Sequence, residues 1–103
     1  MKEDPKESVI EGNFHFPSDD PIYEIHFPQH PVVPGSLIVH AFLRALEEGG
    51  LPIDGLYIEK FSFREFLSPG TYQFKIERRV GGMECRIIKD GKKFAAGTLK
   101  YGA

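Results

Sequence analysis

The chain has 103 residues, of which 41% are hydrophobic and 27% are charged, and this composition is typical of a folded globular protein. Its formal charge of −2 at pH 7 comes without a long basic run, so the sequence gives no reason to expect a nucleic-acid partner. The longest apolar runs, such as residues 37–39, are far too short to cross a membrane, and the charged N-terminus lacks the apolar core of a signal peptide. We therefore predict a cytoplasmic protein with neither nucleic-acid nor membrane partners.

The chain is predicted to form one domain over residues 1–103, with residues 1–7 frayed, because no repeat, linker or low-complexity segment interrupts it. Its lone cysteine, Cys85, cannot form an internal disulfide, which fits a reducing compartment. A domain this small buries only a modest core, and its aromatic residues are mostly phenylalanine. We therefore expect a homodimer or a higher oligomer that shares apolar surface.

The first predicted strand covers residues 9–16 and ends at a cluster of turn residues. An extended segment, residues 22–27, then leads into a loop with three prolines between positions 28 and 34. Proline lacks an N–H group and disfavours helix in the residue before it, so no helix is expected before Gly35.

A helix is predicted from about Gly35 to Gly49, with the hydroxyl of Ser36 as its N-terminal cap. Apolar residues cover most of its circumference, which is typical of a helix enclosed by other structure. Further strands are predicted from turn signals and alternation, and they cover residues 56–66, 72–80, 83–89 and 92–101. One helix and about five antiparallel strands predict an α+β domain whose sheet wraps around one central helix.

His26 stands out as a candidate functional residue, because the proline-rich loop holds it close to the start of the predicted helix. A helix start offers unpaired N–H groups and a partial positive charge. A histidine in that position suits acid–base chemistry on a carbonyl compound.

The order of the elements resembles that of the hotdog-fold β-hydroxyacyl-acyl carrier protein dehydratases, and so does the string His26-Phe27-Pro28-Gln29-His30-Pro31-Val32-Val33-Pro34-Gly35. The resemblance extends from about Val9 to the C-terminus. It implies a dimer with one continuous sheet and two acyl tunnels at the subunit interface. It also implies reversible dehydration of a 3-hydroxyacyl thioester, carried by acyl carrier protein or coenzyme A, without a cofactor or a metal.

The resemblance also assigns roles to single residues. His26 matches the catalytic histidine that removes a proton from C2, and the carbonyl of Val32 would orient its ring. The N–H group of Gly35 matches the group that binds the thioester carbonyl. The second catalytic group in the family is a carboxylate on the helix of the other subunit, and here that position is His40.

His40 is the main departure from the family pattern, and a histidine can donate a proton to the leaving hydroxyl in place of the carboxylate. Arg44, one helical turn further on, stands where relatives commonly carry a neutral amide. We predict His26 and His40 as catalytic residues. The predicted substrate-binding residues are Val32, Gly35, Ser36 and Arg44.

Plainer interpretations remain open. Ser36, His40 and Arg44 are spaced so that they also fit the solvated stripe of a helix, and His26 fits a structural role in its loop. A zinc site of His26, His30 and His40 is a further alternative, although the prolines keep His26 and His30 from sharing a helical face and no cysteine or carboxylate has ligand spacing. At the level of function, the alternatives are a catalytically silent acyl-binding or partner subunit and a hotdog thioesterase.

Overall fold

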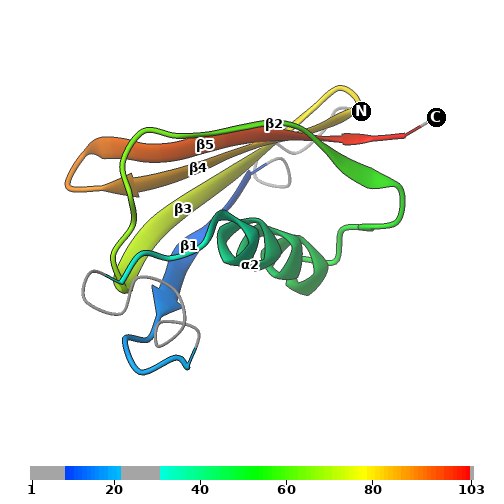
Figure 1. Cartoon of the computed structure of the whole chain (residues 1–103). Coiled ribbons are helices and arrows are strands. Elements are labelled where there is room, and N and C mark those ends of the chain that lie inside the picture. The colour runs from blue at the N-terminus through cyan, green and yellow to red at the C-terminus, as the bar shows by residue number, and fades with distance from the viewer. Residues whose placement is uncertain (1–8, 22–30, 103) are drawn as a thin grey trace.

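A computed structural model describes residues 9–21 and 31–102 of the chain. Within these residues one helix and five strands form (Figure 1). They are β1 (Val9–Phe16), α2 (Gly35–Glu48), β2 (Leu56–Phe63), β3 (Gly70–Arg79), β4 (Gly82–Lys89) and β5 (Lys92–Tyr101). The α+β class predicted from the sequence is confirmed.

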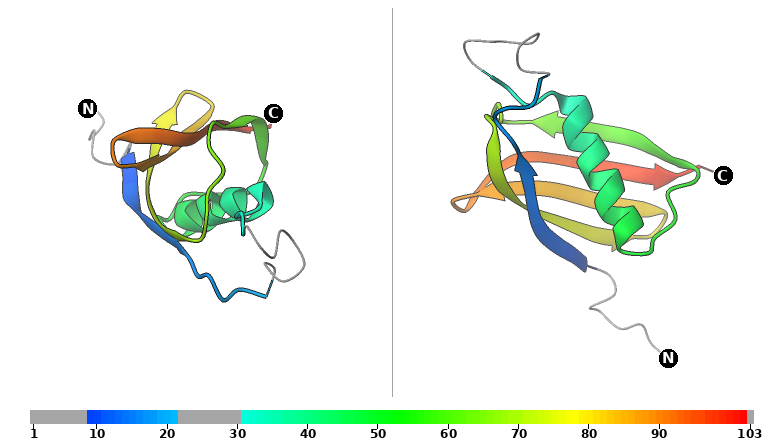
Figure 2. Two further views of the ribbon diagram at one scale, coloured as in Figure 1. Left: turned by 60° about the vertical axis from the view of Figure 1, so that its left-hand side comes forward. Right: turned by 90° about the horizontal axis from the view of Figure 1, so that it is seen from below.

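The five strands form one antiparallel sheet in the order β1-β3-β4-β5-β2, which leaves β1 and β2 at the edges. The helix α2 lies across one face of this sheet (Figure 2). Strand β2 therefore presents an open edge on one side of the helix, and β1 presents the other.

The predicted bounds of β1 and β5 are confirmed, but the strand predicted over residues 56–66 ends at Phe63. The physical reason is a local change in hydrogen bonding: the N–H groups of Arg64 and Glu65 both donate to the carbonyl of Phe94, at 2.8 and 3.3 Å. This shared acceptor ends the regular ladder. The extended segment predicted at residues 22–27 lies outside the described residues.

The prediction that Ser36 caps the helix is wrong. Pro34 is the N-terminal cap residue, with extended backbone angles and no side-chain cap hydrogen bond. The N–H groups of Leu37 and Ile38 both donate to its carbonyl, at 3.0 and 3.3 Å. Ser36 is thus already the second helical residue, two positions beyond the cap. The predicted end is confirmed, because Gly49 donates to the carbonyl of Ala45 and closes the helix.

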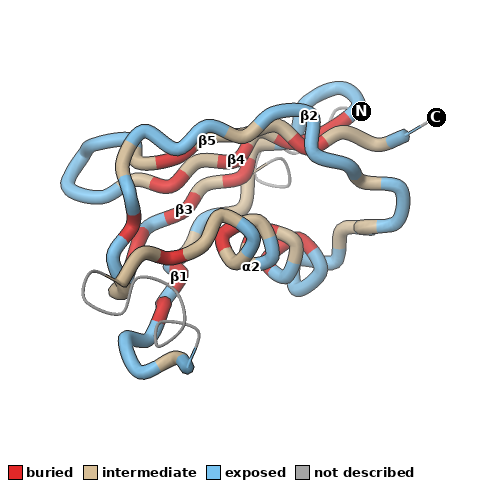
Figure 3. The backbone as a smooth tube through the Cα atoms, viewed as in Figure 1, coloured by how far each residue is buried: buried red, intermediate tan, exposed pale blue. Residues whose placement is uncertain are grey.

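The core lies between α2 and the sheet (Figure 3). The helix buries Ile38, Phe42, Ala45 and Leu46, while its other apolar residues are only partly covered. The predicted full enclosure of the helix is therefore not reached within one chain.

Cys85 on β4 is fully buried, and this burial, helped by the charge of Glu84, raises the pKa of its thiol to about 12.

The opposite face of the sheet carries a cluster of ion pairs centred on Glu77 of β3. Arg79 approaches this carboxylate to 2.9 Å and Lys75 to 3.6 Å, and Arg86 also donates a hydrogen bond to it. Partial burial acts to raise the pKa of Glu77, but the hydrogen bond and the three cations outweigh it and hold the pKa below its usual range.

Among the described residues, no helix is long and apolar enough to span a membrane.

Candidate active site

A hollow of about 250 Å³ lies at the start of α2, and we call it the helix-start hollow. The loop that precedes the helix forms one wall, and the segment that follows β2 forms the other. The two walls are joined by a hydrogen bond of 2.7 Å from the N–H group of Val33 to the carbonyl of Leu67. The lining is largely apolar and includes Val32, Pro34, Gly35, Phe63 and Phe66.

A second hollow, of about 480 Å³, lies between α2 and the edge strand β2, and we call it the helix-side hollow. The helix contributes polar groups from Ser36 and His40 among apolar neighbours. Strand β2 contributes Ile58, Phe61 and Phe63. Three of the predicted site residues, Gly35, Ser36 and His40, therefore share one hollow.

The backbone at the start of α2 is suited to bind a carbonyl oxygen. Because Leu37 and Ile38 donate to Pro34, the N–H groups of Gly35 and Ser36 are the ones without an acceptor in the described residues. No acidic residue lies in the first helical turn to offset the positive end of the helix dipole. The carboxylate of Glu65, which lines the helix-start hollow, is engaged by Lys92 at 2.9 Å. The helix start is therefore open to a developing negative charge.

His40 is exposed on α2, and within the described chain no hydrogen bond or ion pair fixes its ring. It is therefore free to meet a substrate or a second chain that covers the helix-side hollow. Val32 lines the neighbouring helix-start hollow, which has Gly35 in common with the helix-side hollow.

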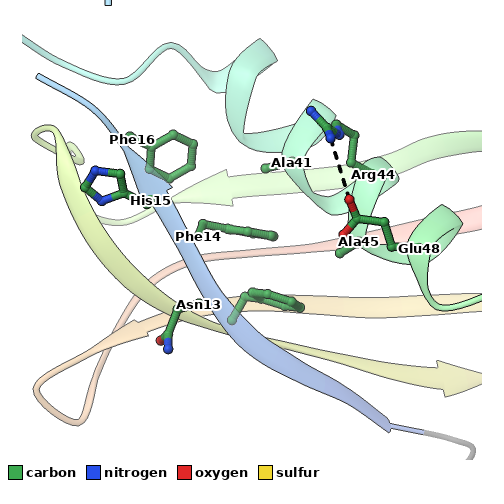
Figure 4. Close-up of a pocket in the computed structure, with 9 residues that line it drawn as sticks. Asn13, Phe14, His15, Phe16, Ala41, Arg44, Ala45 and Glu48 are labelled. Atoms are coloured by element: carbon green, nitrogen blue, oxygen red, sulfur yellow. Dashed lines mark ion pairs between the residues drawn. The ribbon is translucent and has the colours of Figure 1, made fainter. Parts of the chain in front are cut away.

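Arg44 is not brought together with His40. It lines a third site, a cleft of about 350 Å³ between β1 and the opposite side of α2 (Figure 4). Phe14 and Phe16 point from β1 toward the helix in this cleft, and the guanidinium of Arg44 pairs with Glu48 at 3.6 Å. The structure thus separates the predicted substrate-binding residue Arg44 from the other predicted residues of the site.

The remaining histidines divide between two situations. His26 and His30 lie outside the described residues, so the catalytic prediction for His26 and two members of the alternative zinc site are not placed. His15 on β1 points away from α2, with its Nδ1 atom 2.9 Å from the Oγ1 atom of Thr71 (Figure 4).

Sequence reasoning missed the contribution of β2 to the site. Phe61 and Phe63 alternate along this strand and face the helix, while Ile58 is half exposed beside them. The available signal was the run of aromatic residues in a strand at the sheet edge. The contact between Phe63 and Gly35 was not predicted, because β2 and the start of α2 are distant in sequence.

The same fold occurs in a solved assembly, the dehydratase heterocomplex ApeI:P from Xenorhabdus doucetiae. A chain of that assembly matches 98% of this chain over 93% of its own length, with a TM-score of 0.79 and 21% sequence identity. The arrangement of one helix on a five-stranded antiparallel sheet is therefore the hotdog fold, as predicted.

Curated relatives carry the name 3-hydroxyacyl-[acyl-carrier-protein] dehydratase FabZ. The protein from Bordetella parapertussis is 34% identical over 79% of this chain and 63% of its own length. The protein from Thermus thermophilus is 31% identical over 81% of this chain and 69% of its own length. This chain thus spans about two thirds of these relatives, and fold and sequence together define a hotdog protein of the dehydratase class. The model of the ApeI-like dehydratase family matches residues 2–98, and the chain belongs to this family.

Proposed function

We propose that the chain catalyses the reversible dehydration of 3-hydroxyacyl thioesters to trans-2-enoyl thioesters. The observation that carries the proposal is the open start of α2, where the N–H groups of Gly35 and Ser36 have no acceptor in the described residues, while His40 stands exposed on the same helix and available to a second chain. Membership of the ApeI-like dehydratase family and the names of the FabZ relatives support the same reaction. The proposed substrate is carried by acyl carrier protein or coenzyme A, in fatty acid or related acyl synthesis in the cytoplasm.

In the proposed mechanism, the thioester carbonyl accepts a hydrogen bond from the N–H group of Gly35, and His26 removes a proton from C2. Negative charge then develops on the carbonyl oxygen, where the helix start stabilises it. His40 donates a proton to the 3-hydroxyl, the C3–O bond breaks, and water leaves as the C2–C3 double bond forms. The carbonyl of Val32 orients the ring of His26.

We propose a homodimer in which β2 is covered by the second copy, so that His40 of one chain serves the site of the other. Strand β2 is a sheet edge, and Tyr57, Ile58 and Phe63 on it are about half exposed. An open edge with apolar side chains is a surface that a stable protein normally covers. Because the ApeI:P assembly is a heterocomplex, the alternative is that a homologous partner chain, and not a second copy, covers β2.

The decisive experiment is the hydration of a crotonyl thioester on carrier protein and on coenzyme A, followed by the loss of enoyl absorbance. The wild-type chain is compared with His40→Glu, which restores the carboxylate of the family. Glu47→Gln, a charge change on the same helix outside the described hollows, is the control.

Turnover by the wild-type chain supports a dehydratase that uses His40 as its proton donor. Turnover by His40→Glu alone supports the silent-subunit alternative. If neither form hydrates either thioester, dehydration is excluded, and release of free thiol from the same substrates then tests the thioesterase alternative.

A further inference from the structure

The loop in front of α2 is tied to the segment between β2 and β3 by a backbone hydrogen bond. The N–H group of Val33 donates to the carbonyl of Leu67 at 2.7 Å, and Figure 1 shows the two segments meeting near the start of β3. Val33 is 3% exposed and Leu67 is 1% exposed, so little water competes for this bond. Only Pro34, whose ring fixes its φ angle, separates Val33 from Gly35. The position of the Leu67 carbonyl therefore constrains the direction of the Gly35 N–H group.

The segment that carries Leu67 has no regular secondary structure, and a side chain from β3 holds it instead. The hydroxyl of Tyr72 donates to the carbonyl of Ser68, the residue after Leu67, at 2.7 Å. The peptide groups before and after Ser68 are therefore both engaged, the first by Val33 and the second by Tyr72. Hydrogen bonds on two consecutive peptide groups leave their planes little freedom to rotate.

Tyr72 is itself fixed by its surroundings. It is 2% exposed, and the centre of its ring lies 5.8 Å from that of Phe94 and 6.2 Å from that of Phe16. The Nζ atom of Lys89 lies 4.7 Å from the centre of the same ring. The sheet thus holds the hydroxyl in place, and the hydroxyl holds Ser68 relative to the sheet.

We propose that Tyr72 is a positioning residue for the N–H group of Gly35. It acts through the backbone of residues 67–68 and the hydrogen bond from Val33. This inference rests on the proposed function, in which the Gly35 N–H group binds the thioester carbonyl. A donor aimed at the place where charge develops contributes most in the transition state, and a small displacement of it weakens that contribution.

The first test compares Tyr72→Phe with a matched control, Tyr101→Phe. Both variants keep the ring and lose one hydroxyl that donates to a backbone carbonyl at 2.7 Å, but Tyr101 donates to Pro52, beyond the other end of α2. In the hydration of crotonyl coenzyme A, Tyr72→Phe should lower kcat roughly two- to tenfold, the factor that corresponds to one hydrogen bond. KM should change little, because the loss falls on the transition state.

Tyr101→Phe should leave kcat and KM unchanged, and circular dichroism checks that both variants are folded at the assay temperature. An unchanged kcat in Tyr72→Phe, or a fall that Tyr101→Phe shares, overturns the inference. The turnover of the wild-type chain still supports the proposed function in either case.

The second test does not depend on turnover. Exchange of the Val33 N–H group with deuterium is followed by NMR, together with the amide groups of β4. Tyr72→Phe should accelerate exchange at Val33 by roughly two- to tenfold beyond any change in β4, because the segment at residues 67–68 is released locally. A purely structural contribution of Tyr72 to the fold would not accelerate Val33 beyond the amide groups of β4.

A loss of kcat without this local acceleration at Val33 also overturns the inference. If no form hydrates crotonyl coenzyme A, the proposed function fails, and the exchange measurement alone decides whether Tyr72 positions the start of α2. Local acceleration at Val33 in Tyr72→Phe, absent from Tyr101→Phe, then supports the inference. Exchange at Val33 that follows the amide groups of β4 overturns it.

Discussion

The ring of Phe61 fills the space that a side chain at Gly97 would occupy. A Cβ atom on Gly97 would overlap the Cδ2 and Cγ atoms of this ring. The two residues are paired across β2 and β5. The glycine in the middle of β5 is thus the partner of an aromatic residue, and the two form one packing unit.

The first prediction is that Gly97→Ala destabilises the fold. The added methyl group forces Phe61 to move, and overpacking of this kind costs about 1–3 kcal/mol in the free energy of unfolding. Urea denaturation measures the change. The double variant Gly97→Ala with Phe61→Leu is expected to recover part of the loss, because leucine leaves room for the methyl group. Strictly additive effects of the two substitutions would contradict the packing unit.

The second prediction concerns two tyrosines with equal hydrogen bonds and different burial. The hydroxyl of Tyr72 donates to the carbonyl of Ser68 and that of Tyr101 to the carbonyl of Pro52, both at 2.7 Å. Tyr72 is 2% exposed, so Tyr72→Phe leaves the Ser68 carbonyl without this donor and lowers the free energy of unfolding by about 1 kcal/mol. Tyr101→Phe should cost less, because water reaches that more open position. Equal losses would contradict the burial argument.

The third prediction concerns the pH dependence of stability at Glu77. Its pKa is lower in the folded chain than the ordinary value of 4.5. Glu77 therefore stabilises the fold fully above that ordinary value, and this contribution is lost as the pH falls through the lowered folded-state pKa. Glu77→Gln should be less stable than wild type at pH 7, by up to about 1 kcal/mol since the pairs lie near the surface.

The difference between Glu77→Gln and wild type should shrink as acid protonates the carboxylate, and thermal unfolding followed by circular dichroism at several pH values measures it. It should also shrink in high salt, which screens the ion pairs. A difference that stays constant from neutral pH to strong acid would be inconsistent with the ion-pair cluster.

The fourth prediction concerns His26. If this residue is the base of the proposed reaction, His26→Ala should lower turnover of a crotonyl thioester by roughly 10²- to 10⁴-fold, the usual share of general acid–base catalysis. The unfolding temperature of the variant should match that of wild type. Loss of folding together with activity would instead identify His26 as a structural residue of its loop.

The order of the elements could be predicted because local turn chemistry sets it. Asp90 and Gly91 both adopt positive φ angles, 53° and 73°, as a tight hairpin turn requires, and the sequence signalled that turn directly. The end of the helix at Gly49 was predicted from an equally local signal, the pair of glycines at positions 49 and 50. The cap was misjudged because Ser36 is a common cap residue, while Pro34 sets the first turn through its backbone alone.

The site could be predicted only where it is local in sequence. Ser36 and His40 lie four residues apart on one helix, so their spacing predicted a shared face, and they do share a hollow with Gly35 at the helix start. Arg44 had a similar spacing, but four residues of α-helix turn by about 40° more than one full circle. Its side chain lies in the cleft on the β1 side of α2. The position of Phe63 beside Gly35 depends on the pairing of β2 with β5, which no local sequence pattern predicts.

Because Cys85 is buried, the reactivity of its thiol reports how often the folded chain opens. Thiol reagents attack the thiolate form, and this thiol is both fully buried and held protonated by a pKa of about 12. Labelling must therefore wait until the sheet separates from the helix, and its rate at low denaturant measures how often that happens. The natural residue Cys85 thus lets the kinetics of opening be followed as a mass shift, without an engineered cysteine.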